Sequence, residues 1–342
     1  MGTYRLLLAV AVLLYHAGVT IGGRAIGVEA VISFYVISGY VMTALFDRHY
    51  SHRIGGFYID RAMRLFPQFL FYLAVTQGVI WIFQPASQFI GELTAGKAIV
   101  NLTMVGLNLG QWVKNLTIMP QTWSLGLEWQ FYLLFPFMLR ARIAFFITSF
   151  MLFAVTFATA WINPDTWGYR MLPGTAFMFL IGSFLYRNDR TFVWSAYAAL
   201  CAGFVITWAT PSLQNHLRFE VLTGLVIGVP IVAALGSVRL GRFDALLGNL
   251  SYGVFLNHFA LIWLLQVAGI SQRSPLYLPA LLMASIAAAW LSYELIEKRI
   301  IELRHGIRCR RESRELMSSD HSEVWSADVA AGRPELGPPA AR

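Results

Sequence analysis

Apolar residues occur in long, nearly uninterrupted runs, and the short segments between these runs carry most of the charged residues. A helix that crosses the hydrocarbon core of a bilayer needs about 20 mainly apolar residues. Ten runs approach this length, and they lie at 6–23, 27–46, 65–84, 123–139, 143–162, 171–186, 191–209, 218–235, 246–267 and 276–300. The pattern therefore predicts an all-α, polytopic membrane protein with about ten transmembrane helices.

The segment 85–122 is the main interruption of this pattern. Its apolar part, near 98–109, also holds Asn101, Thr103, Asn108 and glycines. We expect a loop or a re-entrant segment here, because a true membrane span would invert the orientation of everything that follows.

The composition agrees with a membrane protein. Hydrophobic residues make up 57% of the chain and charged residues 13%, against about 45–50% and about 25% in soluble domains. These values exclude a soluble globule, a disordered chain and a basic nucleic-acid-binding domain. From this composition we also expect no nucleic-acid partner. The two cysteines cannot form a disulfide framework, and neither lies in a metal-ligand spacing, so we expect no bound metal.

The distribution of basic residues predicts the orientation. With a cytosolic amino terminus, 20 of the 26 Lys and Arg residues fall in inward segments and 6 in outward ones. Positive charge concentrates on the cytosolic side of membrane proteins, so both termini are predicted to be cytosolic. From about residue 304 the apolar residues become too few for a core. We therefore divide the chain into a transmembrane domain, 1–303, and a disordered cytosolic tail, 304–342.

The first predicted helix carries two polar residues eleven positions apart, Arg5 and His16. Eleven residues complete about three helical turns and about 16 Å of rise, so both side chains share one face. This face suits a tunnel with an anion contact at its cytosolic mouth and a proton-transfer group farther in, because imidazole titrates near physiological pH. A packed, hydrogen-bonded structural histidine is the alternative.

Arg61 and Arg64 lie in the inward segment before the third predicted span. At a spacing of three they share a helix face, and two guanidinium groups match phosphate oxygens well. The alternative is ordinary cytosolic anchoring, with Asp60 as the counter-ion.

Two further groups stand out in the apolar runs. Glu128 follows Trp123 and Ser124 about one turn inside the fourth span, where a carboxylate needs a partner. A histidine on a neighbouring helix would serve, and such a pair could act as base and orienter. His258 in the ninth span either lines the same site or packs in the core.

Together these segments resemble the acyltransferase-3 family of bacterial integral-membrane O-acyltransferases, over about residues 4–303. The matching motifs keep the family's order along the chain: Arg5 with His16; Phe34-Tyr35-Val36-Ile37-Ser38-Gly39-Tyr40; Arg61, Arg64 and Pro67; Trp123-Ser124-Leu125 with Glu128 and Tyr132; Ser251-Tyr252 with His258; and Tyr293-Glu294 with Glu297-Lys298. The family also places an acidic residue directly before the aromatic pair. Here three extra residues separate Glu29 from Phe34-Tyr35, so the resemblance does not carry that role to Glu29.

The resemblance implies an O-acyltransferase of the bacterial cytoplasmic (inner) membrane. The donor would be acetyl-CoA or another acyl-CoA, and the acceptor a hydroxyl of a polysaccharide, an oligosaccharide or a lipid-linked glycan. His16 would be the general base, with Glu128 as its catalytic partner. Arg5, Arg61 and Arg64 would bind the donor. Trp123, Ser124 and His258 would be substrate-binding, with Trp123 and Ser124 as positional candidates for the group that stabilises the oxyanion.

A transporter of lipid-linked sugars is the alternative, because a tunnel with His and Glu also suits a proton relay. Transporters of this size often contain inverted repeats, and the two halves of this sequence show no convincing similarity. The sequence therefore favours the enzyme.

Overall fold

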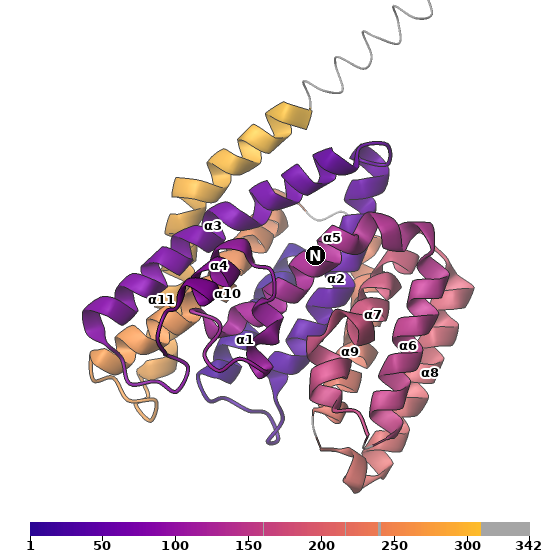
Figure 1. Cartoon of the computed structure of the whole chain (residues 1–342), viewed down its shortest axis with the longest axis horizontal. Coiled ribbons are helices and arrows are strands. Elements are labelled where there is room, and N and C mark those ends of the chain that lie inside the picture. The colour runs from indigo at the N-terminus through magenta and orange to yellow at the C-terminus, as the bar shows by residue number, and fades with distance from the viewer. Residues whose placement is uncertain (160, 216, 239–240, 309–342) are drawn as a thin grey trace, which may run out of the picture. The chain divides into compact units, whose positions relative to one another are not determined.

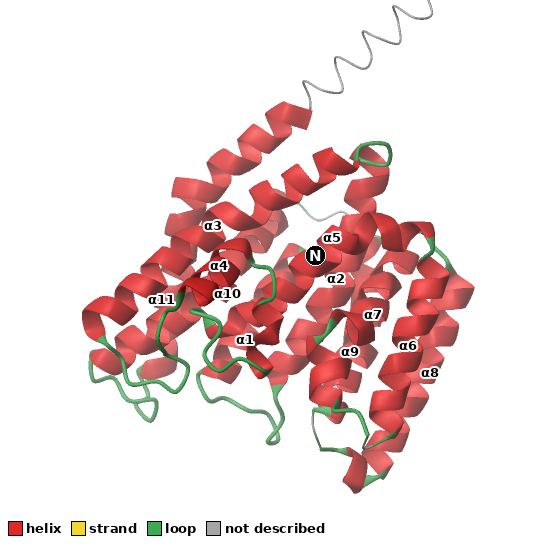
Figure 2. Cartoon of the chain, in the orientation of Figure 1, coloured by secondary structure: helices red, strands yellow, loops and turns green. Residues whose placement is uncertain are grey.

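The structure, a computed structural model, describes residues 1–159, 161–215, 217–238 and 241–308. Within these ranges the regular structure is helical, apart from one isolated bridge between Ile21 and Arg24 (Figure 2). Long apolar runs form helices in a membrane because only a helix or a closed barrel satisfies every backbone polar group there. The all-α fold is thus as predicted.

A helix occupies each of the ten predicted positions. They are α1 (Gly2–His16), α2 (Ile26–His49), α3 (Ile54–Phe83), α5 (Trp123–Arg140), α6 (Arg142–Ala158), α7 (Leu172–Tyr186), α8 (Arg190–Ala209), α9 (Arg218–Gly236), α10 (Arg242–Val267) and α11 (Tyr277–Ser292). Among the described residues, six helices are long and apolar enough to cross a membrane, and α1, α6 and α7 are shorter apolar helices. The protein is therefore a multi-pass membrane protein, and the number of crossings stays a prediction.

Two helix boundaries differ from those predicted. The third predicted span begins at 65, but α3 begins at Ile54. The charged residues of this segment lower its hydropathy without interrupting the helix, so Arg61 and Arg64 lie on α3 itself. The first span was predicted to reach 23, but α1 ends at His16. Gly18 follows with a φ of +91°, a conformation that glycine adopts without strain.

The segment 85–122 folds into short helical pieces: α4 (Ala95–Thr103), η1 (Leu107–Gln111) and η2 (Pro120–Thr122). None of these pieces is long enough to cross a bilayer, which agrees with the predicted loop. Asn101 is buried and joins two parts of the segment, because its amide nitrogen donates to the Leu116 carbonyl oxygen (2.7 Å) and its amide oxygen accepts from the Ile118 N–H (2.9 Å). The segment packs on the start of α5, where Leu107 faces Gly126.

The helices that hold the predicted site residues pack against one another in the middle of Figure 1. α1 packs along α10, and α2 packs along both α7 and α9. The α2–α7 contact is close because a Cβ atom on Gly39 would lie 1.7 Å from the Phe179 carbonyl oxygen. The α3 helix packs on α10 and α5. The predicted disordered tail falls largely on 309–342, outside the described residues, whereas 304–308 are helical.

Candidate active site

His16 and His258 form one end of the site. α1 and α10 bring the two rings together, with His16 Nδ1 3.1 Å from His258 Nε2. The rings stack at a centroid distance of 5.1 Å, and Phe259 packs on both. His258 is fully buried, whereas His16 keeps accessible surface. The structure therefore gives His16 a histidine partner on a neighbouring helix, and that partner is 242 residues away in the chain.

The hydrogen bonds of His258 favour one arrangement of protons. Its Nδ1 lies 3.4 Å from the Val254 carbonyl oxygen, one turn earlier on α10. A nitrogen that faces a carbonyl oxygen carries the hydrogen, so Nε2 of the neutral ring is an acceptor. His16 then donates from Nδ1 to His258. The Val12 carbonyl oxygen also lies within reach of the His16 ring.

An aromatic and cationic group stands beside the histidine pair. The Arg170 guanidinium lies 4.5 Å from the ring centre of Trp123, and Trp123 packs edge-on against Tyr169 at 4.8 Å. Arg170 acts electrostatically on His16 and is held by Asp165 (3.1 Å). Arg170 was not predicted from the sequence, because an isolated arginine in a loop carries no motif.

Ser124 is buried, and its hydroxyl forms a hydrogen bond with the residues that immediately precede α5. Its hydroxyl donates to the Gln121 carbonyl oxygen at 3.3 Å. The Gln121 side chain in turn donates to the Phe255 and Leu256 carbonyl oxygens of α10, at 3.2 and 2.8 Å. Ser124 therefore lies in a contact that fixes the start of α5 beside the His258 segment.

Glu128 has different partners from the one predicted. Its Oε1 accepts hydrogen bonds from Ser38 Oγ (2.6 Å) and from the Tyr132 hydroxyl, and the two hydroxyls lie 3.2 Å apart. Among the described residues no hydrogen bond joins Glu128 to His16. The reason is geometric, since Glu128 faces α2 and Tyr132 follows it by one turn on α5. The hydrogen bonds of Glu128 leave its Oε2 open.

The three predicted donor arginines fall into three environments. Arg61 is buried, paired with Asp60, and its Nη1 lies 3.5 Å from the Met42 sulfur. Arg64 is paired with Glu297, and its guanidinium lies 5.2 Å from the ring centre of Tyr252. The Arg5 guanidinium has no hydrogen bond or ion pair with any described residue.

Arg5 nevertheless belongs to the same polar group. Its side chain is partly buried and keeps some accessible surface. The charged residues Arg64, Glu128 and Glu297 act on it electrostatically. The same three charged residues act electrostatically on Tyr252, which is buried. Arg5, Tyr252 and Glu128 are thus linked electrostatically, and α1 leads from Arg5 to His16 at its other end, so that these residues and the histidine pair form one series. We call this series the polar column.

Glu29 lies outside the polar column. Its electrostatic neighbours are Glu220 and Arg24, and Arg24 lies 3.8 Å from Glu220. With three extra residues between it and Phe34-Tyr35, the Glu29 side chain therefore lies near Arg24 and Glu220 and not among the residues of the polar column. No cluster of three or more His, Cys, Asp or Glu residues able to hold a metal occurs in the described part of the chain.

Comparison with known proteins identifies the family. A profile described as an acyltransferase domain matches residues 3–294. A protein of Komagataeibacter xylinus named "Putative membrane-bound transacylase BcsY" is 28% identical over 85% of this chain and 80% of its own length. The O-acetyltransferase OatA of Staphylococcus aureus (strain NCTC 8325 / PS 47) is 24% identical over 85% of this chain, which spans 55% of OatA.

An uncharacterized protein of Aquifex aeolicus (strain VF5) is 30% identical over 55% of this chain and 90% of its own length. No solved structure matches the chain. The family match and the two named relatives favour an acyltransferase over a transporter.

Proposed function

Because the chain belongs to the acyltransferase-3 family, it is a membrane acyltransferase, and we propose that it transfers an acetyl group from acetyl-CoA to a carbohydrate hydroxyl. The acceptor would be a cell-surface or exported glycan, and the membrane the bacterial cytoplasmic membrane. The observation that carries this proposal is the contact between His16 and His258, at the outward end of a polar column that begins at Arg5.

His16 is the proposed general base. With Nδ1 donating to His258, Nε2 of His16 is the nitrogen offered to the acceptor. The acceptor hydroxyl gives its proton to Nε2 while its oxygen attacks the thioester carbonyl carbon. The carbon–sulfur bond then breaks, and the CoA sulfur leaves with the proton held by His16. A positioned base of this kind contributes about 10²–10⁴-fold to a rate.

His258 is the proposed positioning residue for this base. Its Nδ1 faces the Val254 carbonyl oxygen, so its Nε2 accepts from His16 and fixes both the tautomer and the ring plane of His16. Glu128 was expected in this role, but Ser38 and Tyr132 hold its Oε1. We propose instead that Glu128 balances the positive charge of Arg5 and Arg64 within the column.

Arg5 is the proposed first contact of the donor phosphates. Its guanidinium has no partner among the described residues, and guanidinium groups bind phosphate oxygens strongly. Arg64 would also bind the donor phosphates, after its ion pair with Glu297 is replaced by a contact with the donor. Arg61, buried against Asp60, would support α3 rather than bind phosphate.

Trp123 is the proposed acceptor contact, because its ring packs against the Arg170 guanidinium, and the charge of Arg170 acts on His16. Aromatic rings have an apolar face on which the carbon-bound hydrogens of a sugar can pack. Ser124 would hold the start of α5 in place for this contact.

Membranes that carry the protein test the proposal. We would measure thiol release from acetyl-CoA and incorporation of labelled acetyl into the host's own glycans. His16→Ala should lower both rates by at least about 100-fold. The matched control is His52→Ala, an exposed histidine between α2 and α3, which should keep wild-type rates. Equal rates in His16→Ala and wild type would reject His16 as the base. Absence of thiol release by the wild type with several acceptor pools would reject the donor.

A further inference from the structure

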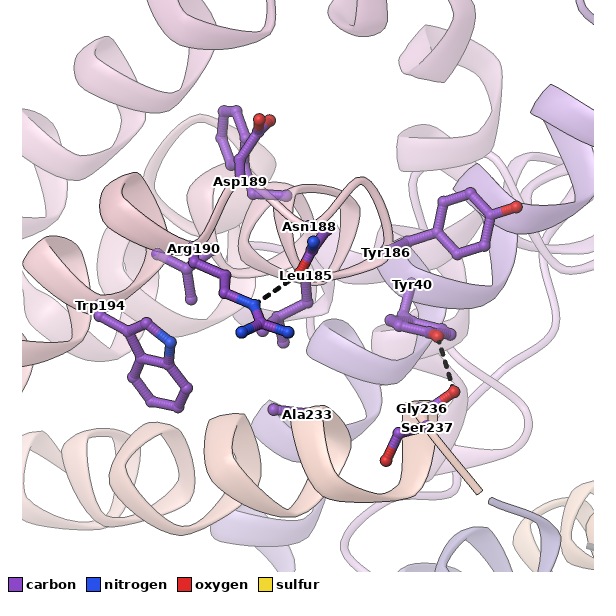
Figure 3. Close-up of a pocket in the computed structure, with 12 residues that line it drawn as sticks. Tyr40, Leu185, Tyr186, Asn188, Asp189, Arg190, Trp194, Ala233, Gly236 and Ser237 are labelled. Atoms are coloured by element: carbon purple, nitrogen blue, oxygen red, sulfur yellow. Dashed lines mark hydrogen bonds between the residues drawn. The ribbon is translucent and has the colours of Figure 1, made fainter. Parts of the chain in front are cut away.

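A hollow lies away from the polar column, where α7 ends, α8 begins and α9 ends. This cavity has a volume of about 430 Å³ and includes Tyr40, Tyr186, Arg190, Trp194, Ala233 and Gly236 in its lining (Figure 3). Cavities that bind small molecules have volumes of about 300–1,000 Å³. We call it the Arg190 cavity.

One cation points into the Arg190 cavity. Asn188, in the α7–α8 turn, has a φ of +60°, which asparagine tolerates better than most residues. Its amide oxygen accepts from Arg190 Nε at 2.8 Å. Figure 3 shows the Arg190 guanidinium directed towards Ala233 of α9. Its only described partner is a neutral amide, so its charge remains available to an anion.

The nearby carboxylates do not neutralise this charge. Asp189 also lines the cavity, but its carboxylate lies on the opposite side from the Arg190 guanidinium in Figure 3 and pairs with Arg142 at 3.0 Å. Asp47 pairs with Arg187 at 2.8 Å. A further cation, Arg48, lies 6.0 Å from the ring centre of Tyr186. The electrostatics of the cavity therefore favour an anion.

The position and the walls of the cavity favour a lipid over a water-soluble anion. α8 exposes apolar side chains along its length, with Trp194 43% and Trp208 65% exposed, as expected of a helix that faces lipid. Trp and Tyr side chains concentrate at the level of the lipid headgroups, which fits Trp194, Tyr40 and Tyr186. Val193 and Ala233 add apolar surface for an acyl chain.

We propose that the Arg190 cavity binds the phosphate headgroup of an anionic membrane phospholipid, with Arg190 as the phosphate ligand. By the distribution of basic residues, this lipid would belong to the cytosolic leaflet. The Tyr40 hydroxyl donates to the Gly236 carbonyl oxygen at 3.1 Å and ties α2 to α9 at the cavity wall. A bound lipid would therefore brace α2, the helix that also holds Ser38 against Glu128.

Native mass spectrometry of the purified full-length protein tests the proposal, with short-chain phosphatidylglycerol and phosphatidylcholine as probes. The wild type should retain one phosphatidylglycerol in preference to phosphatidylcholine. Arg190→Gln should weaken phosphatidylglycerol binding by about tenfold, because a charge-assisted hydrogen bond contributes that much. Arg190→Lys should retain part of the binding. The matched control, Arg242→Gln, changes an exposed arginine at the start of α10 and should bind as the wild type does.

A second variant and a second probe keep the test independent of local folding at Arg190. Ala233→Leu should lower lipid binding by filling the cavity while leaving Arg190 in place. Glycerol phosphate, which lacks acyl chains, should compete weakly. Unchanged phosphatidylglycerol binding in Arg190→Gln or in Ala233→Leu, or an equal loss in Arg242→Gln, would overturn the proposal. Competition by glycerol phosphate as strong as that by the lipid would replace it with a soluble-phosphate site.

Discussion

The arginines predicted to bind the donor differ in what holds them. Sequence spacing selected Arg5, Arg61 and Arg64 equally well, because spacing reports only that two side chains share a helix face. The structure separates them by their partners: Asp60 for Arg61, Glu297 for Arg64, and no described hydrogen bond or ion pair for Arg5. The availability of a guanidinium depends on such contacts, and a single sequence does not reveal them.

The contrast between Arg5 and Arg61 gives a prediction. Arg5→Gln should leave the protein folded and raise the KM for acetyl-CoA by about tenfold, because it removes a phosphate contact. Arg61→Gln should instead lower the free energy of unfolding by about 3–5 kcal/mol, since it removes the cation of a buried ion pair. Thermal unfolding and acetyl-CoA kinetics on both variants check this. A change of KM in a stable Arg61→Gln protein, with no change in Arg5→Gln, would reverse the assignment.

At the scale of elements, the hydropathy pattern located a helix at every predicted position and correctly left 85–122 without a spanning helix. It misplaced the start of α3 by eleven residues, because the charged residues in the first part of α3, Arg61 and Arg64 among them, lower the mean hydropathy without ending the helix. It also could not show which helices touch. The pairing of α1 with α10 depends on packing, and this pairing makes His258 the partner of His16.

Close packing of α2 on α7 gives a prediction at this scale. Gly39→Ala places a methyl group against the Phe179 carbonyl oxygen, and we expect a loss of about 2–3 kcal/mol in the free energy of unfolding. The control is Gly78→Ala on α3, where a methyl group meets nothing within 4 Å. That variant should be unchanged or more stable by up to about 1 kcal/mol, because alanine favours helix. Thermal unfolding in detergent compares the two. Equal stability would show that α2 and α7 pack less closely.

For the whole molecule, the polar column links a predicted cytosolic end to a predicted outward end. This arrangement suits an enzyme whose donor is cytosolic and whose acceptor is exported, and it requires the orientation that the basic residues predict. The two cations Arg5 and Arg64 share their surroundings with two carboxylates, Glu128 and Glu297, of which Glu297 pairs with Arg64. Balanced charge is what an interior site surrounded by hydrocarbon requires.

The orientation is tested by labelling single cysteines with a membrane-impermeant maleimide. In a background with Cys201 and Cys309 changed to serine, Lys114→Cys between η1 and η2 should react in intact spheroplasts. Ser51→Cys, between α2 and α3, should react only after permeabilisation. Both positions are exposed, so access depends on the side of the membrane. Labelling of Ser51→Cys in intact spheroplasts would place the donor arginines on the wrong side for cytosolic acetyl-CoA.

A double-mutant cycle on the histidine pair, read out as acetyl transfer at saturating acetyl-CoA, tests whether His16 and His258 act as one unit. If His258 acts only by orienting His16, its replacement by alanine should lower kcat about 10- to 100-fold, as loss of a supporting partner does at other sites. His16→Ala should lower kcat further, and the double variant should match His16→Ala within about twofold, because residues that act as a unit are not additive. Losses that multiply in the double variant would show that the two histidines act independently, and full activity in His16→Ala would show that His16 is not the base.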